Sequence, residues 1–189
     1  MSPTRPNIIF IVADDLGFAD LGCYGGREAA FGHVSPVIDQ LAADGLRFTQ
    51  GYSNSPVCSP TRFALMTARY QYRLRGGADE PINSRSKGST TLGLPPEVPT
   101  LPSLLKKAGY QTPFIGKWHA SIPGPEADRL AAYGFDGLTY YDPTGANLQG
   151  TVGDAPDGYL NDRDIADQAA DWLRVLSRSA QPWCLTVSF

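Results

Sequence analysis

The stretch Asn7-Ile8-Ile9-Phe10-Ile11-Val12-Ala13 decides the class of fold, because it is an apolar run without polar alternation. A strand buried on both faces has this pattern, whereas a strand with one solvated face alternates apolar and polar residues. Strands buried on both faces occur in parallel sheets that are covered by helices. The run therefore predicts a parallel sheet with helices on its two sides.

Further strand-like and helical segments alternate along the rest of the chain. Other strands are predicted at residues 46–52, 110–115 and 183–189. Helices are predicted from Ser35-Pro36 to a stop at Gly45, from the cap Thr100 to a stop at Gly109, and over residues 162–178. Residues 69–99 and 121–161 read as long loops, and Pro113 favours an edge or irregular strand at 110–115. This alternation is typical of an α/β sheet with right-handed crossovers.

A possible reactive centre lies in Pro56-Val57-Cys58-Ser59-Pro60-Thr61-Arg62. Ser59 is a good helix cap and Pro60 suits the first helical position, so we expect a helix to begin there and Cys58 to lie just outside its positive end. Arg62, four residues after Cys58, would lie on the same side of the first turn. This arrangement suits an oxyanion. These seven residues alone are equally consistent with a partly buried cysteine before an ordinary helix.

Two other groups of polar residues follow predicted strands. Asp14-Asp15 comes directly after the first strand and offers the hard oxygen ligands that Ca²⁺ or Mg²⁺ prefers, although such a pair can also be a solvated acidic turn. Lys117 and His119 follow the strand at 110–115, and in an extended chain they point the same way while Trp118 points opposite. Because ligands bind at the carboxyl ends of parallel strands, both groups and Cys58 are expected to meet at one sheet edge.

The net charge, the length of the apolar runs and the number of cysteines argue against several classes of protein. The 189 residues carry a net charge of −3, which argues against nucleic-acid binding. No apolar run approaches the ~20 residues of a membrane span. The odd count of three cysteines, without a secretory signal, argues against a disulfide framework and predicts a reducing, cytoplasmic location. The oligomeric state stays open.

Two segments resemble the signatures of the type I sulfatases. Residues 58–67 contain Cys-x-Pro-x-Arg and resemble the first signature, although the family usually has Gly where this chain has Ala68. Residues 109–119 resemble the second, although the family continues Leu-Gly where this chain has Ala120-Ser121. The two segments occur in the family's order, and Asp14-Asp15 matches the family's first acidic metal ligands.

The resemblance implies an alkaline-phosphatase-like fold, with a mixed, mostly parallel sheet between helices. It implies hydrolysis of sulfate esters by a formylglycine that a formylglycine-generating enzyme makes from Cys58. The metal ligands would be Asp14, Asp15 and the modified Cys58, with Ca²⁺ the family's usual ion and Mg²⁺ an alternative. The substrate would be a small-molecule sulfate ester.

The resemblance also implies roles for the catalytic residues. Arg62 would hold an oxygen of the hydrated formylglycine at Cys58, and Lys117 would neutralise sulfate oxygens. His119 would orient or deprotonate the other hydroxyl. Family members are normally much longer, so residues 1–189 are expected to be the N-terminal part of a single catalytic domain, and this chain would lack the rest of the site.

Two rival functions stay open. One is a phosphonate or phosphate ester hydrolase, because the same metal and hydrated aldehyde suit tetrahedral phosphorus. The other is a truncated or inactive binding protein that retains half of the site. Relative rates on an aryl sulfate and an aryl phosphate diester would distinguish the first rival, and the chemical state of Cys58 would distinguish the second.

Overall fold

The structure, a computed structural model, describes residues 5–26, 31–74, 93–120, 131–136, 138–141 and 162–189. The chain forms two compact units. One unit comprises Met1–Val12 and Asn54–Phe189, and the other comprises Ala13–Ser53. In the part of the chain described, no helix is long and apolar enough to cross a membrane.

The larger unit is built on a four-stranded parallel sheet. Its strand order is β1-β4-β2-β3, with bounds β1 Ile8–Val12, β2 Phe114–Lys117, β3 Leu138–Tyr141 and β4 Cys184–Ser188. All three strand pairs are parallel, and the last strand of the chain lies between the first and the second. The prediction of a parallel sheet is confirmed.

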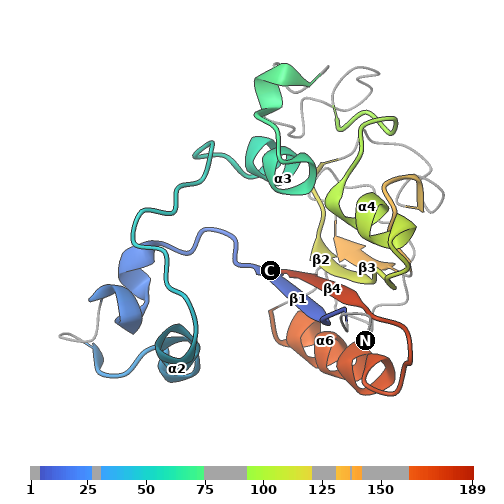
Figure 1. Cartoon of the computed structure of the whole chain (residues 1–189). Helices are drawn as coiled ribbons and strands as arrows, with labels where there is room; N and C mark the ends of the chain where they lie inside the picture. The colour runs from blue at the N-terminus through green and yellow to red at the C-terminus, as the bar shows by residue number, and fades with distance from the viewer. Residues whose placement is uncertain (1–4, 27–30, 75–92, 121–130, 137, 142–161) are drawn as a thin grey trace. The chain divides into compact units, whose positions relative to one another are not determined.

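Helices lie on both sides of this sheet (Figure 1). α6 (Asp162–Leu176) packs against β4 and β2, whereas α3 (Cys58–Thr67) and α4 (Leu101–Lys107) lie on the opposite side. Side chains of β2 alternate accordingly. Ile115 joins the apolar cluster under α6, and Phe114 joins the cluster that contains Phe63 of α3. The sequence therefore places one apolar layer on each face of the sheet.

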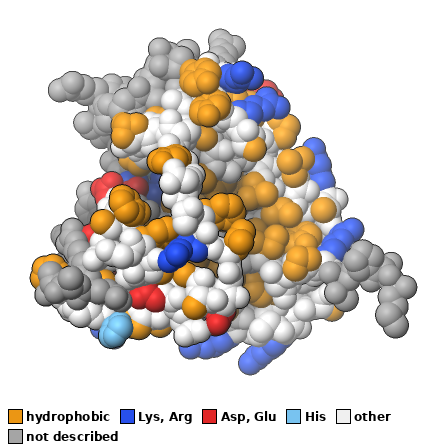
Figure 2. Space-filling view, turned by 60° about the vertical axis from the view of Figure 1, so that its left-hand side comes forward, with side chains coloured by type: hydrophobic (Ala, Val, Ile, Leu, Met, Phe, Trp, Pro, Cys, Tyr) orange, Lys and Arg blue, Asp and Glu red, His pale blue; other side chains and the backbone are white. Residues whose placement is uncertain are grey.

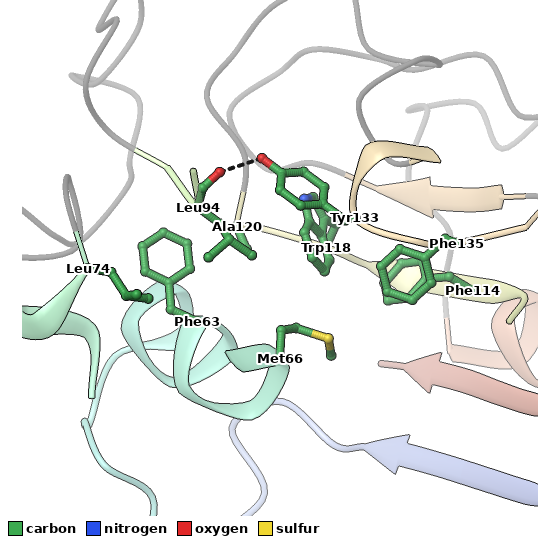
Figure 3. Close-up of a cluster of buried hydrophobic side chains, with 9 residues drawn as sticks. All are labelled: Phe63, Met66, Leu74, Leu94, Phe114, Trp118, Ala120, Tyr133 and Phe135. Carbon is green, nitrogen blue, oxygen red and sulfur yellow. Dashed lines mark hydrogen bonds between the residues drawn. The ribbon is translucent and has the colours of Figure 1, made fainter. Parts of the chain in front are cut away.

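An aromatic cluster fills the space between α3 and β2 (Figure 3). Its members are Phe63, Met66, Leu74, Leu94, Phe114, Trp118, Ala120, Tyr133 and Phe135. The rings of Trp118 and Phe114 meet edge to face with centroids 5.8 Å apart. The hydroxyl of Tyr133 donates to the carbonyl of Leu94 at 2.5 Å, which satisfies the polar end of a buried ring. This cluster fixes α3 relative to the end of β2.

The first strand is less covered than its sequence predicts. Ile9 and Ile11 are 48% and 60% exposed. They pair in register with Leu185 and Val187, so they point to the α6 side of the sheet. α6 covers β4 and β2, and this leaves the same face of β1 open. Hydrophobic side chains are also visible at the surface in Figure 2.

Two predictions about strands were wrong. Residues 46–52 do not form a strand, and Leu46 and Tyr52 are more than four-fifths exposed. The strand predicted at 110–115 is β2 at Phe114–Lys117, an inner strand and not an edge strand. Pro113 precedes it and has no N–H to donate, but its carbonyl accepts from the N–H of Thr186, so proline still takes part in the pairing with β4 as an acceptor.

A further strand lies in a segment predicted to be a loop. β3 occupies residues 138–141 and pairs with β2, whereas residues 142–161 of the same predicted loop lie outside the described residues. Most of the predicted loop at 69–99 is likewise outside them, apart from the short 3-10 helix η3 (Gln71–Arg73) and residues near Leu94.

The predicted helix caps are confirmed for two helices. Thr100 accepts from the N–H of Ser103, and Ser103 accepts from the N–H of Thr100, so α4 begins with a reciprocal capping box. α2 (Pro36–Asp44) lies between Ser35 and Gly45, as the sequence predicts. The observed α6 ends two residues before the predicted boundary at 178.

The smaller unit is held together around Asp39 of α2. Its carboxylate accepts from the N–H of Cys23 at 2.6 Å and from the hydroxyl of Ser35 at 2.9 Å. Partial burial raises the pKa of Asp39, but these hydrogen bonds outweigh it, so the net pKa lies below its usual value. The contacts attach α2 to the short 3-10 helix η2 (Gly22–Tyr24), which in turn contacts the 3-10 helix η1 (Phe18–Asp20).

Candidate active site

The site begins at the first turn of α3. Val57 is the N-cap and Cys58 is the first helical residue, so the prediction that Ser59 caps the helix was wrong by two positions. Pro60 still fits, because the first four N–H groups of a helix have no partner within it and proline lacks only such a group. The first N–H bond within the turn runs from Thr61 to the carbonyl of Val57. Half-buried Cys58 therefore lies at the positive end of the helix.

Arg62 lies one turn after Cys58 and is only 4% exposed. Its Nη1 donates to the carbonyl of Lys117 and to the hydroxyl of Ser188, each at 2.5 Å, and its Nη2 reaches the carbonyl of Phe189 at 3.5 Å. These acceptors lie at the carboxyl ends of β2 and β4. A buried cation needs such compensation. Arg62 thus attaches the start of α3 to the ends of two strands.

His119 meets Cys58 at the same place. The distance from Cys58 Sγ to His119 Nδ1 is 3.1 Å, within hydrogen-bonding range for sulfur, and His119 is 6% exposed. His119 has a φ of 49°, which ends the extended course of β2. The structure therefore brings together Cys58, Arg62 and His119 from sequence positions up to 61 residues apart.

Backbone strain is concentrated near the candidate residues. Among the described residues, those other than glycine with positive φ are Asp15, Ala68 and His119. The left-handed region is unfavourable for residues with a Cβ, and such conformations gather at functional sites. Two of the three are candidate site residues. Ala68 is the C-cap of α3 and stands where the resembled family usually has glycine.

Lys117 and Trp118 complete the second signature. Trp118 is buried in the aromatic cluster while His119 contacts Cys58, so these neighbours point to different surroundings, as predicted. The carbonyl of Lys117 accepts from Arg62, and its side chain is half-buried. The approach of the Lys117 ammonium to Cys58 stays a prediction.

Asp14 and Asp15 form a turn directly after β1. Asp14 is half-buried and Asp15 is exposed with a φ of 55°. Both belong to the smaller unit, so their predicted proximity to Cys58 stays a prediction. In the described residues no group of three or more His, Cys, Asp or Glu side chains is placed to hold a metal. Two carboxylates fill only part of the six to eight oxygen positions around Ca²⁺.

Ser188 and Gly116 also belong to the surroundings of Arg62, although neither role was predicted from the sequence. Ser188 is 1% exposed and contacts the guanidinium of Arg62. Gly116 pairs with Ser188 in register and has a φ of 97°. A glycine inside an otherwise apolar strand was the available signal, because it often marks a close approach of another backbone.

Comparison with known proteins identifies the family. A sequence model of the sulfatase family matches residues 6–189. This chain belongs to the sulfatase family. The resemblance drawn from the two signatures is therefore confirmed over nearly the whole chain.

Relatives of this sulfatase chain are themselves much longer. Human arylsulfatase A is 45% identical over 121 residues, which cover 64% of this chain and 22% of the relative. The N-acetylgalactosamine-6-O-sulfatase of Bacteroides thetaiotaomicron is 33% identical over 189 residues, covering 83% of this chain and 35% of the relative.

A solved structure supports the same assignment. The PsFucS1 sulfatase from Pseudoalteromonas sp. superposes with a TM-score of 0.70 and 27% identity, over 98% of this chain and 44% of that chain. Its similarity confirms the alkaline-phosphatase-like class of fold. This sulfatase chain spans between 22% and 44% of the lengths of these three proteins.

Proposed function

We propose that the whole protein hydrolyses sulfate esters, and that Cys58 is the residue at which the reaction takes place. The observation that carries this proposal is the 3.1 Å approach of Cys58 Sγ to His119 Nδ1 at the start of α3. Membership of the sulfatase family supports the type of reaction. Sulfatases generally use a formylglycine and a divalent metal.

The surroundings of Cys58 fit a formylglycine at this position. The residue is half-buried, lies at the first turn of a helix, and has a ring nitrogen within hydrogen-bonding range. A hydrated aldehyde would supply two oxygens on one carbon, one to attack sulfur and one to drive release of sulfate. The partner during maturation would be a formylglycine-generating enzyme that recognises Cys58, Pro60 and Arg62.

The chemistry of Asp14 and Asp15 fits a hard cation. Both offer carboxylate oxygens, and they are adjacent in a turn after a strand, where ligands of α/β sheets bind. We propose that they hold Ca²⁺, with Mg²⁺ the alternative, together with ligands from the part of the whole protein that lies beyond these 189 residues. A bound metal would withdraw negative charge from the sulfate oxygens.

The other residues have distinct tasks in this proposal. His119 orients or deprotonates a hydroxyl at position 58 through Nδ1, the atom that lies near Cys58 Sγ. Lys117 supplies a positive point charge for the sulfate oxygens. Arg62, buried among carbonyl and hydroxyl acceptors, holds the first turn of α3 in place, and we propose that it also donates to an oxygen at position 58. The substrate class is a small-molecule sulfate ester, as the names of the relatives suggest.

Peptide mass spectrometry of the full-length protein, made with and without a formylglycine-generating enzyme, tests the proposal. We expect an aldehyde at position 58 only with the enzyme, and turnover of an aryl sulfate only in that sample. Cys58→Ala should lose nearly all turnover while still folding. Cys23→Ala, which removes a thiol from the smaller unit, is the control and should retain it. Full turnover by protein with an unmodified thiol at position 58 contradicts the proposed nucleophile.

A further inference from the structure

We propose that Ser188 is a positioning residue, which sets the geometry between Cys58 and His119 by fixing the guanidinium of Arg62. Ser188 is the last residue of β4 and is 1% exposed. Its hydroxyl oxygen lies 2.5 Å from Arg62 Nη1. The effect on turnover rests on the proposed function, whereas the effect on Cys58 and His119 does not.

One guanidinium connects the two elements that carry the reactive pair. Arg62 lies four residues after Cys58, so holding its head group restrains the first turn of α3. The Nη1 that contacts Ser188 also donates to the carbonyl of Lys117, two residues before His119. A shift of the guanidinium would therefore change the distance between Cys58 Sγ and His119 Nδ1.

The position of Ser188 is itself restrained by β2. Ser188 pairs with Gly116, and a Cβ placed on Gly116 would lie 1.8 Å from the carbonyl oxygen of Ser188. The two backbones are thus in direct contact. Ser188 and Thr186 lie on the same face of β4, two residues apart, and only the hydroxyl of Ser188 is within hydrogen-bonding distance of Arg62 among the contacts described.

Loss of the Ser188 hydroxyl would misalign His119 and the side chain at position 58 without removing either reacting group. Ser188→Ala removes one acceptor from a buried cation, which then must find another partner. The guanidinium would move with α3, and the imidazole of His119 would no longer meet the side chain at position 58 at hydrogen-bonding distance. Misplacement by about 1 Å can cost a large part of a catalytic rate, on the order of a hundredfold.

The first measurement is the rate at which iodoacetamide alkylates Cys58 in full-length protein made without the formylglycine-generating enzyme. Peptide mass spectrometry follows this one thiol at a single neutral pH. The imidazole of His119 lies 3.1 Å from this thiol, so His119→Ala gives the rate of the thiol without that neighbour. We expect Ser188→Ala to fall several-fold toward that rate. A purely structural role predicts the opposite, because loosening around Cys58 exposes the thiol and speeds alkylation.

Matched variants decide the outcome. Ser188→Thr keeps the hydroxyl and should restore the rate, whereas Thr186→Val removes a buried hydroxyl from the same strand face and should leave it unchanged. If Ser188→Ala does not fold, Ser188→Cys replaces the hydroxyl with a weaker acceptor and should give an intermediate rate. An unchanged or faster rate in the folded Ser188→Ala protein, or no rescue by threonine, overturns the proposal.

A second measurement uses protein with formylglycine at position 58. We expect Ser188→Ala to lower kcat on an aryl sulfate by roughly tenfold or more with little change in KM, because alignment is lost and substrate contacts remain. A rise in KM at constant kcat contradicts positioning. If the unsubstituted protein carries formylglycine and hydrolyses no sulfate ester, the proposed function fails, and the alkylation rates still decide the role of Ser188.

Discussion

Gly116 of β2 and Ser188 of β4 are register partners whose backbones leave no room for a side chain between them. An ideal Cβ on Gly116 would lie 1.8 Å from the carbonyl oxygen and 2.8 Å from the carbonyl carbon of Ser188. Gly116 also has a φ of 97°, which disfavours any residue with a Cβ. The glycine of the second signature is therefore required by the sheet, directly behind the candidate active site.

Gly116→Ala should consequently destabilise the protein severely. We expect a loss of about 3 kcal/mol or more in the free energy of unfolding, since backbone strain and a clash with another backbone act together. Gly25→Ala is the control, because Gly25 also has positive φ but nothing within 4 Å of its added Cβ. That variant should lose only about 1–2 kcal/mol. Urea unfolding of both variants measures the difference, and equal losses would show that the contact with Ser188 is unimportant.

Ala68→Gly should stabilise the protein. Ala68 is the C-cap of α3 and has a φ of 54°, so glycine would remove a left-handed strain at that position. We expect a gain of about 0.5–1 kcal/mol, reduced from the full strain because glycine also gains freedom in the unfolded chain.

Ala64→Gly in the interior of the same helix serves as the matched control for Ala68→Gly. It makes the same chemical change where the backbone is right-handed, and should lose about 0.5–1 kcal/mol. The two variants should therefore shift the midpoint of urea unfolding in opposite directions. A loss of stability in Ala68→Gly would mean that the methyl group of Ala68 makes a favourable contact that exceeds the strain.

The fold was predictable wherever local chemistry and tertiary packing agree. The apolar run at residues 7–13 correctly indicated a parallel sheet, and Thr100, Ser35 and Gly45 correctly bounded two helices. Residues 46–52 have the composition of a strand but form none, because a strand requires a partner that local sequence does not specify. β3 was missed for the converse reason, since its pairing with β2 is a non-local contact.

The sequence predicted which residues belong to the candidate site better than it predicted the contacts between them. Spacing placed Arg62 one turn after Cys58, and the strand order brought His119 to the same end of the sheet. The buried bond from Arg62 to Ser188 connects residues 126 positions apart, and no pattern in the sequence indicates it. The placement of Asp14 and Asp15 beside Cys58 stays a prediction.

Asp136 should make stability depend on acidity. Partial burial raises the pKa of Asp136, but hydrogen bonds from Lys106 and from Thr112, together with the charge of Lys106, outweigh it and hold the net pKa below its ordinary value. A carboxyl whose pKa is lower when folded stabilises the fold at pH values above the unfolded pKa, and this contribution is lost as pH falls through the folded pKa.

Asp136→Asn should accordingly reduce stability at neutral pH and matter less in acid. The amide loses the charge that attracts Lys106, whose Nζ lies 2.5 Å from Asp136 Oδ1. The difference in free energy of unfolding between the two proteins should be constant above about pH 5 and shrink as the pH falls below the ordinary pKa of aspartate. Urea unfolding across this range measures it. A difference that grows as the pH falls would have the wrong sign for a lowered pKa.

Lys117→Ala should test whether sulfate and phosphate esters share one site. As a sulfatase, the full-length, formylglycine-containing protein is expected to prefer sulfate monoesters. A lysine ammonium is a point charge that suits a tetrahedral anion of either sulfur or phosphorus, so we also expect slow hydrolysis of phosphoesters at the same site. The variant should depress both activities by the same factor, on the order of a hundredfold.

The matched control for Lys117→Ala is Lys107→Ala, which removes the same charge from an exposed position at the end of α4 and should leave both rates unchanged. Comparison of the two variants separates a local effect at the transition state from the general effect of losing a cation. Loss of one activity alone in Lys117→Ala would rule out a shared site. A phosphate diester that reacts faster than the aryl sulfate in the unsubstituted protein would instead favour the phosphoester hydrolase, with Cys58 and His119 unchanged in their roles because neither depends on the identity of the central atom.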